Sequence, residues 1–331
     1  MTGPFASTGK QIEAAARLYM AQNGETVGGK KVELIVKDDT SAPDVTKRIA
    51  QELVVNDKVN VLAGFGLTPL ALATAPIATQ SKTPLGVMAA ATSSITEASP
   101  FIIRTNFTLP QPSVSMVDWA PNNGIKKVVT LVSDYGPGID AEKYFKDRFL
   151  FNGGQVVDTL RVPMRNPDFA PFLQKVRDLK PDAMFVFVPS GAGAALMKQY
   201  AERGMGEVAV GVVTSHHYST SHNSAVNKKF VAAFEKANAG LRPNFMAVGG
   251  YDGMRVIYEA AKATKGGSGE ELLAAMKGQI FESPRGPMFI DAQTRDVVHN
   301  IYIRKVEKVN GQLYNQEFET LKDVKDPGKK K

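Results

Sequence analysis

The chain of 331 residues contains no cysteine, which excludes disulfides, thiolate metal sites and cysteine nucleophiles. No apolar run approaches the roughly 18 residues that a membrane-spanning helix needs, and the opening Met1–Pro4 shows no signal-peptide pattern. We therefore expect either a cytoplasmic protein or the mature form of an exported one. The lack of cysteine suits an oxidising compartment.

Excess charge is also small. Lys and Arg number 40 against 33 Asp and Glu, and the net charge is +7. The last ten residues carry five lysines and two aspartates, so the rest of the chain is near +4 and the basic end is expected to be solvated. No basic stripe interleaved with aromatic residues occurs elsewhere, which argues against a nucleic-acid partner.

What is present is typical of a globular protein. Apolar residues make up 43% and charged residues 22%, which excludes disordered, collagen-like and low-complexity classes. At about 150 residues per domain, the length predicts about two domains.

Strand and helix patterns alternate in two series, which predicts two doubly wound, parallel α/β lobes. The strands of the first series are expected at 32–36, 59–63, 84–88 and 101–104, with helices at 44–56 and 68–80. Those of the second series are expected at 128–132, 155–161, 183–188 and 208–213, with helices at 140–151, 169–179 and 191–203. The apolar run at 183–188 predicts a strand buried on both faces.

The last third of the chain departs from this alternation. Helices are expected at 224–239, 247–264 and 270–277, followed by strands at 288–290, 300–306 and 313–318. Asn310-Gly311 between the last two strands predicts a hairpin turn. A terminal hairpin in an α/β chain suggests that the lobes are linked by several crossings.

Candidate motifs for catalysis or metal binding are weak. Ser190-Gly191-Ala192-Gly193 is half of a dinucleotide fingerprint, but its third glycine position holds Leu196, so a tight strand-to-helix turn is the better interpretation. The histidines near 216–222 have no carboxylate at helical spacing and indicate lid or hinge packing rather than a metal. We predict no catalytic residue, no metal and no cofactor.

Small hydroxyl residues follow several of the predicted strands. Gly64–Thr68 and Ala89–Ser94 do so in the first series, and Tyr135 and Ser190 hold the equivalent ends in the second. Ordinary turn chemistry would explain any one of these loops. Because open α/β sheets bind ligands at the carboxyl ends of their strands, the set predicts a cleft where hydroxyls and helix N–H groups hold a carboxylate.

Short motifs resemble type I periplasmic solute-binding proteins of ABC transporters, in the leucine/isoleucine/valine-binding family. They are MTGPFASTG at 1–9, KDD at 37–39, AAAT at 89–92, FIIRT at 101–105, DYGPG at 134–138 and GGYD at 249–252. The resemblance implies two Rossmann-like lobes joined by a three-crossing hinge, with a ligand bound between lobes that close on it. It further implies a non-catalytic, monomeric periplasmic receptor that binds a small carboxylate and delivers it to ABC permease subunits.

The resemblance also implies lobe boundaries and site residues. The lobes are expected at 1–119 plus 247–294 and at 120–246 plus 295–331. The ligand-binding residues implied are Phe5, Ser7, Leu67, Thr68, Ala90, Thr92, Tyr135, Ser190, Gly191 and Tyr251. Thr68 would hold the carboxylate with Ala90 and Thr92 beside it, and Tyr135 would form an aromatic wall from the second lobe. Phe5 and Ser7 are expected in the first loop, and Tyr251 near the second crossing.

Two departures from the family pattern bear on the ligand. The family begins with a strand before the first loop, and it has a further strand and loop after the helix at 191–203. Both sheets are thus expected to lack a strand, whether by truncation or because a strand is donated in trans. The missing loop normally supplies an acid for an amino acid's ammonium, and Glu207 is not at the matching position.

A buried ammonium without an acceptor would cost several kcal/mol. The run at 212–218 resembles binders of aromatic carboxylates, so a benzoate or cinnamate-type acid is favoured and a branched-chain amino acid is the alternative. Two other classes stay open: a nucleotide-dependent enzyme on two lobes, and a ligand-sensing regulatory domain. Thermal stabilisation by NAD or ATP with turnover would support the first, and a DNA-binding segment in the native gene the second.

Overall fold

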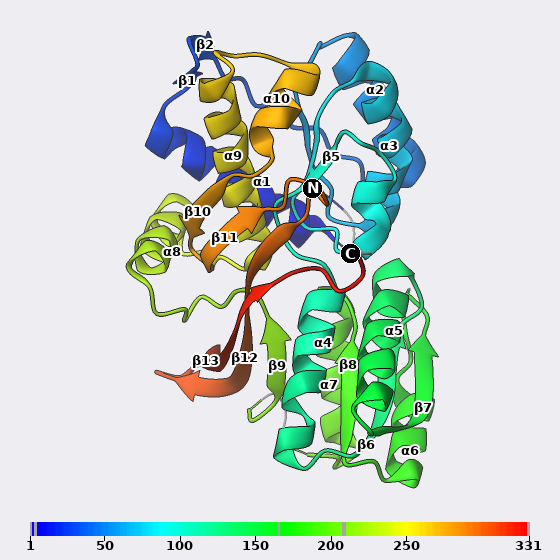
Figure 1. Ribbon diagram of the computed structural model, residues 1–331. Coiled ribbons are helices and arrows are strands. Elements are labelled where there is room, and N and C mark those ends of the chain that lie inside the picture. Colours follow the sequence, from blue (N-terminus) through cyan, green and yellow to red (C-terminus); the bar gives the residue numbers. More distant parts are fainter. Residues whose placement is uncertain (1, 3–4, 165, 207–209, 330–331) are drawn as a thin grey trace.

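The computed structural model describes residue 2 and residues 5–164, 166–206 and 210–329. Two α/β lobes lie one above the other in Figure 1, and a long antiparallel hairpin runs beside them.

The first lobe contains a parallel sheet of three strands in the order β3 (Leu62–Gly64), β4 (Leu85–Val87) and β5 (Ile102–Arg104). Helices α2 (Pro43–Val55) and α3 (Thr68–Ser81) pack beside each other in this lobe. The strand predicted at 32–36 is absent, and these residues have no regular structure. A strand exists only with a hydrogen-bonded neighbour, and no strand among the described residues pairs with this segment.

Four further helices lie in the upper half of Figure 1. They are α1 (Ala6–Asn23), α8 (Ala225–Ala237), α9 (Phe245–Ala263) and α10 (Gly269–Met276), and a small hairpin of β1 (Thr26–Val27) and β2 (Lys30–Lys31) follows α1. Helix α1 was not predicted. It lies against α9 at Gly250, where an added Cβ would be 2.6 Å from the Ile12 carbonyl oxygen.

Helix α8 shares a buried cluster with α1 and α9, to which it contributes Phe230 and Phe234. The predicted boundaries place 225–237 in the second lobe instead. The division of the chain into lobes at these residues stays a prediction.

The second lobe has a parallel sheet in the order β7 (Gln155–Val162), β6 (Lys127–Ser133) and β8 (Ala183–Phe187). Its helices are α4 (Pro110–Trp119), the 3-10 turn η2 (Pro121–Asn123), α5 (Gly136–Phe151), α6 (Ala170–Leu179) and α7 (Ser190–Glu202). The prediction that the strand near 183–188 is buried on both faces is wrong. Because β8 lies at the edge of this sheet, its side chains are half-buried, and Val186 is 36% exposed.

The third sheet is antiparallel, in the order β10 (Ile280–Ser283), β11 (Gly286–Ile290), β12 (Val297–Val309) and β13 (Gln312–Val324). Asn310 and Gly311 have φ of 51° and 82°, which confirms the predicted hairpin turn. The strand predicted at 208–213 instead occurs as β9 (Val213–His216), because β9 pairs with residues 302–305 of β12. Positions 208 and 209 of that prediction lie outside the described residues.

Among the described helices, none combines the length and apolar character that crossing a bilayer requires.

Candidate functional site

The hydroxyl groups of two threonines meet at the carboxyl end of the first sheet. Thr68 begins α3 after β3, and Thr92 precedes the 3-10 helix η1 (Ser93–Glu97) after β4. Both residues are buried, and their Oγ1 atoms are 2.8 Å apart. The close placement follows from the parallel pairing of β3 with β4, which brings the two following loops to one edge.

Helix α5 of the second lobe begins directly over this pair. A Cβ added at Gly136 would lie 3.2 Å from Thr92 Oγ1 and 3.8 Å from Thr68 Cγ2. Helices α3, η1 and α5 therefore direct their N-terminal ends at the same point. First-turn N–H groups lack intrahelical acceptors and carry partial positive charge, so this point suits an anion.

A hydrogen bond also links η1 to α5 here. The Ser93 backbone N–H, in the first turn of η1, donates to Asp140 Oδ2 of α5 at 2.9 Å. Burial raises the pKa of Asp140 above its usual value. The carboxylate that reaches the residue after Thr92 is thus already engaged by a backbone donor.

Aromatic residues form the wall on the side of the second lobe. Tyr135 immediately precedes α5, and its ring stacks on Phe187 at the end of β8, with centroids 6.3 Å apart and an interplanar angle of 17°. Burial raises the pKa of Tyr135, so the phenol stays protonated. Opposite, Ala90 is buried and its N–H donates to the Phe65 carbonyl at 2.9 Å.

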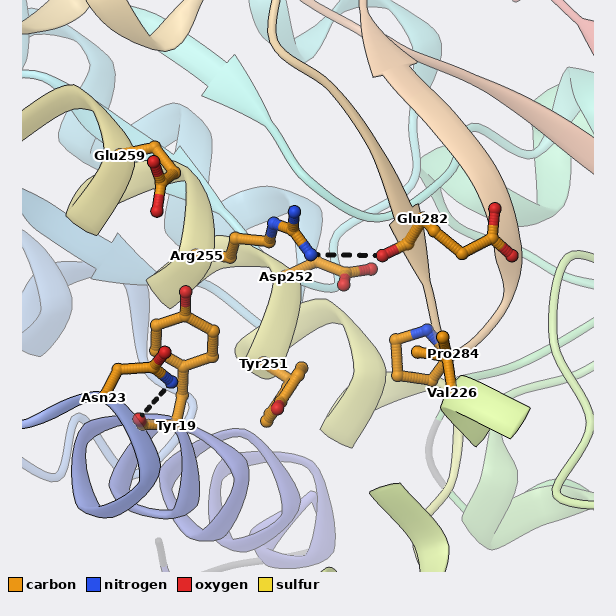
Figure 2. Close-up of a pocket in the computed structure, with 9 residues that line it drawn as sticks. All are labelled: Tyr19, Asn23, Val226, Tyr251, Asp252, Arg255, Glu259, Glu282 and Pro284. Atoms are coloured by element: carbon orange, nitrogen blue, oxygen red, sulfur yellow. Dashed lines mark hydrogen bonds between the residues drawn. The ribbon is translucent and has the colours of Figure 1, made fainter. Parts of the chain in front are cut away.

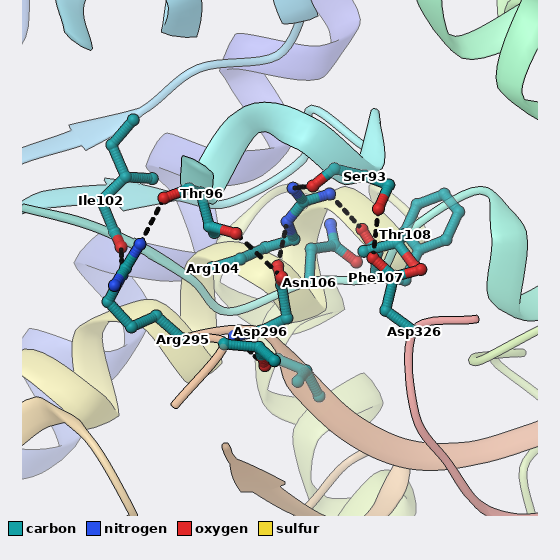
Figure 3. A network of polar contacts seen from close by, with 12 residues as sticks. Ser93, Thr96, Ile102, Arg104, Asn106, Phe107, Thr108, Arg295, Asp296 and Asp326 are labelled. Atoms are coloured by element: carbon teal, nitrogen blue, oxygen red, sulfur yellow. Dashed lines mark hydrogen bonds and ion pairs between the residues drawn. The ribbon is translucent and has the colours of Figure 1, made fainter. Parts of the chain in front are cut away.

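Arg104 fixes the loop that carries Thr92 (Figure 3). It is fully buried at the end of β5, where its Nε lies 2.9 Å from Asp296 Oδ1. Its other nitrogens donate to the Thr92 carbonyl at 2.7 Å and the Phe107 carbonyl at 3.2 Å. The sequence shows Arg104 at the end of an apolar strand, but this pattern alone does not indicate a supporting role.

The end of the chain also binds this loop. Ser93 Oγ donates to Asp326 at 2.6 Å, and Lys329 Nζ donates to the Ser93 carbonyl at 2.6 Å. The expectation of a solvated basic end is therefore wrong for Lys329, whose side chain is only 9% exposed. Carbonyl and carboxylate acceptors of η1 and of Asp296 surround its ammonium, a non-local arrangement that composition cannot indicate.

The hydroxyls of Thr68 and Thr92 are in contact, Tyr135 directly precedes Gly136 beside them, and half-buried Leu67 directly precedes α3. Ala90 lies two residues before Thr92, and contact of these residues with a ligand stays a prediction. At the N-terminus, half-buried Phe5 precedes α1, whereas Ser7 lies in the first helical turn and is exposed, not in a loop. The neighbouring Thr8 faces the site's loop instead, since a Cβ at Gly66 would lie 2.7 Å from Thr8 Cγ2.

Ser190 and Gly191 begin α7 directly after β8, which is the strand-to-helix turn expected for the Ser190–Gly193 motif. The positions of their side chains lie outside the described part of the structure. Their contact with a ligand stays a prediction.

Tyr251, predicted to bind the ligand, lies in a cavity away from the threonine pair (Figure 2). Its ring packs on Tyr19 and Phe230, with centroids 5.0 and 4.9 Å apart, and its hydroxyl donates to Gln22. It lines a cavity of about 270 Å³ between α1, α8 and α9. The orientation of α9 explains this position. Gly249 and Gly253 face Met88, and Tyr251, two residues from each of them, therefore points to the opposite side of the helix.

The paired histidines pack against aromatic side chains, and their place in a lid or hinge stays a prediction. His216 and His217 stack with centroids 4.4 Å apart and both contact Phe107 and Phe245. A second cavity, of about 350 Å³, opens beside His216 and Phe245 and includes Arg242 and Arg304 in its lining. The sequence did not predict a role for Phe107, Phe187 or Phe245, because nothing in their local sequence indicates long-range packing.

His222 is bound to Glu317, 2.8 Å from Nδ1 to Oε2. Within the described part of the chain, no group of three or more His, Asp and Glu side chains gathers in a way that could hold a metal ion.

Comparison with known proteins assigns the chain to a family. The family model described as "Periplasmic binding protein" matches residues 1–210 and 204–312. The chain belongs to the periplasmic binding protein family. A curated relative, "Leu/Ile/Val-binding protein homolog 6" of Brucella abortus (strain 2308), is 42% identical over 356 residues, which cover 99% of this chain and 91% of the relative.

Solved periplasmic binding proteins agree in fold. The solute binding protein of an ABC transporter from Rhodopseudomonas palustris BisB5, in complex with 3,4-dihydroxybenzoic acid, is 59% identical with a TM-score of 0.96, covering 99% of this chain and 96% of that one. The corresponding protein from R. palustris HaA2, in complex with p-hydroxybenzoic acid, is 39% identical with a TM-score of 0.95 over the same shares. The predicted fold class and the resemblance are confirmed. Solute-binding proteins of this kind are not enzymes.

Proposed function

We propose that this periplasmic binding protein is the extracytoplasmic receptor of an ABC importer for an aromatic carboxylate, such as a benzoate or hydroxycinnamate. The acid binds between the lobes, which close on it, and it is then passed to the membrane permease. The protein works in the periplasm as a mature chain and as a monomer. Light scattering coupled to gel filtration tests the monomer.

One observation carries the proposal: the Thr68–Thr92 hydroxyl pair lies beneath the start of α5. The two hydroxyls and the N–H groups at the starts of α3 and α5, apart from Pro69 and Pro137, which have none, offer a carboxylate donors without a cationic side chain. Since these donors come from both lobes, an anion held there favours the closed arrangement over the open one.

The remaining surroundings favour an aromatic ring over an amino acid. Tyr135, Phe187 and Phe107 supply flat apolar walls, as sites for small aromatic ligands do. Asp140, the acid beside the threonine pair, already accepts a bond from Ser93. The relatives support the same choice, since the structure with 59% identity holds a dihydroxybenzoate. The name of the Brucella relative keeps branched-chain amino acids as the alternative.

Calorimetric titration with two ligand panels tests the proposal. Benzoate, 4-hydroxybenzoate, 3,4-dihydroxybenzoate and a hydroxycinnamate form one panel, and L-leucine, L-isoleucine and L-valine form the other. We expect saturable heat from aromatic acids and none from the amino acids. Saturable heat from leucine with none from any aromatic acid would overturn the ligand assignment.

A further inference from the structure

Two adjacent histidines lie within an aromatic cluster where β9 pairs with β12. His216 ends β9 and His217 follows it, and their rings are stacked at an interplanar angle of 29°. Phe107 contacts both rings, with centroids 4.7 Å from each. Phe245 contacts His216 at 4.6 Å. His217 also stacks on His299, with centroids 5.1 Å apart, and His216 lines the second cavity together with Arg242 and Arg304.

These imidazoles have polar atoms with no partner. His217 is fully buried, and neither its Nδ1 nor its Nε2 has a hydrogen-bond partner among the described residues. The Nδ1 of His216 is likewise buried and unpartnered. A neutral imidazole carries one donor and one acceptor, and burying such groups unsatisfied is costly. The other two histidines differ, since His222 pairs with Glu317 and His299 with Gln111.

The same cluster reaches the threonine pair. Phe107 packs with Ala91, the neighbour of Thr92, and with Ala141 of α5, and Phe187 packs against this group. The Leu109 N–H donates to the Ala91 carbonyl at 2.9 Å, which holds the segment before α4 against the Thr92 loop. An apolar aromatic path thus runs from the donors at Thr68 and Thr92 to the unpartnered nitrogens of the histidines.

We propose that His216 and His217 bind the ring hydroxyl of a hydroxylated aromatic acid whose carboxylate lies at Thr68 and Thr92. This inference rests on the proposed function and adds to it the residues that select the substituent. The phenol donates its proton to an imidazole lone pair and accepts a bond from an imidazole N–H, while its ring packs along Phe107. Benzoate, which lacks the hydroxyl, leaves these groups unpartnered.

Binding ratios in the wild-type protein and two variants test the inference. We expect 4-hydroxybenzoate to bind the wild type about tenfold or more tightly than benzoate, because a site built to hydrogen-bond a hydroxyl rejects the analogue without one. In His217→Phe the ratio should fall to within about threefold, because 4-hydroxybenzoate loses the partner of its hydroxyl. His222→Phe, the matched control, should keep the wild-type ratio.

A measurement on the unmutated protein covers the case in which His217→Phe does not fold. With ¹⁵N-labelled histidine, 4-hydroxybenzoate should shift the ring nitrogen signals of His216 or His217, and benzoate should leave them in place. Equal affinities of the wild type for both acids, or no such shift, would overturn the inference while leaving the proposed function standing. Failure of every aromatic acid to bind would overturn the proposed function itself.

Discussion

The hydroxyl oxygens of Thr68 and Thr92 lie 2.8 Å apart, although the residues begin different helical segments after different strands. Each hydroxyl can donate one bond and accept two, so the pair can turn at least one donor toward a bound anion. Gly136 completes the arrangement from the other lobe, because only a residue without a side chain leaves the pair uncovered. The first three predictions concern this contact and its support.

Removal of the first hydroxyl should weaken carboxylate binding. A hydrogen bond to a charged group is worth about 1.5–3 kcal/mol, so Thr68→Ala should raise the Kd of an aromatic acid about 10- to 150-fold. Thr68→Ser keeps the hydroxyl and should stay close to the wild type. Calorimetric titration measures both, and an unchanged Kd in Thr68→Ala would mean that the anion lies elsewhere.

A side chain at Gly136 should oppose closure. Its Cβ would already lie 3.2 Å from Thr92 Oγ1, and overfilling a close contact costs about 1–3 kcal/mol. Gly136→Val should therefore weaken ligand binding about 5- to 150-fold, while the thermal midpoint of the ligand-free protein changes little. Gly193→Ala, where the nearest atom is 3.9 Å away, serves as the control. Wild-type affinity in Gly136→Val would contradict a closed arrangement at this point.

Loss of the buried arginine should destabilise the fold. Arg104 and Asp296 are almost fully buried, and removal of one partner of such a pair costs about 3–5 kcal/mol. Arg104→Met should show this loss in urea unfolding, and Arg104→Met combined with Asp296→Leu should recover part of it. The exposed pair Lys82–Glu270 is the comparison, because solvent screens this pair and Lys82→Ala should change the stability far less than Arg104→Met does. Equal costs at the two sites would refute the supporting role of Arg104.

Stability should fall in mild acid. Burial holds the pKa values of His216, His217 and His299 well below the ordinary 6.5. Below pH 6.5 the unfolded chain therefore binds more protons than the folded one, so stability that is present above this pH is lost as the pH decreases. Each histidine contributes up to about 1.4 kcal/mol per pH unit.

Thermal midpoints measured between pH 7.5 and 5 test this expectation. The wild type should melt at progressively lower temperature below pH 6.5, and His217→Phe should show a shallower dependence. A midpoint that does not change across this range would show that the three imidazoles are not buried as the structure has them.

Elements defined by local chemistry were predictable from the sequence. Thr68-Pro69 marks the start of α3, and Asn310-Gly311 marks the turn between β12 and β13. The parallel strands were placed to within a few residues, because a short apolar run between turn residues needs no knowledge of the rest of the chain. The meeting of the loops 64–68 and 89–94 followed from these strands, since parallel strands present their carboxyl ends at one edge, whereas the choice of Thr68 and Thr92 within the loops came from the family resemblance.

The predictions that were wrong concern residues whose positions depend on contacts with segments distant in the sequence. The apolar run at 32–36 has strand composition but no neighbouring strand among the described residues, and β9 takes its position from pairing with β12. Tyr251 was misplaced because close glycine contacts set the rotation of α9. Phe107 and the bound Lys329 lie near the site only through tertiary contacts, which one sequence does not display.

The crystal structure of the complex with 4-hydroxybenzoate tests the central claim most directly. The account predicts the carboxylate within hydrogen-bond distance of both the Thr68 and Thr92 hydroxyls, with the ring beside Tyr135 and Phe107. A carboxylate bound instead in the second cavity, by Arg242 and Arg304, with the threonine hydroxyls still bonded only to each other, would contradict it.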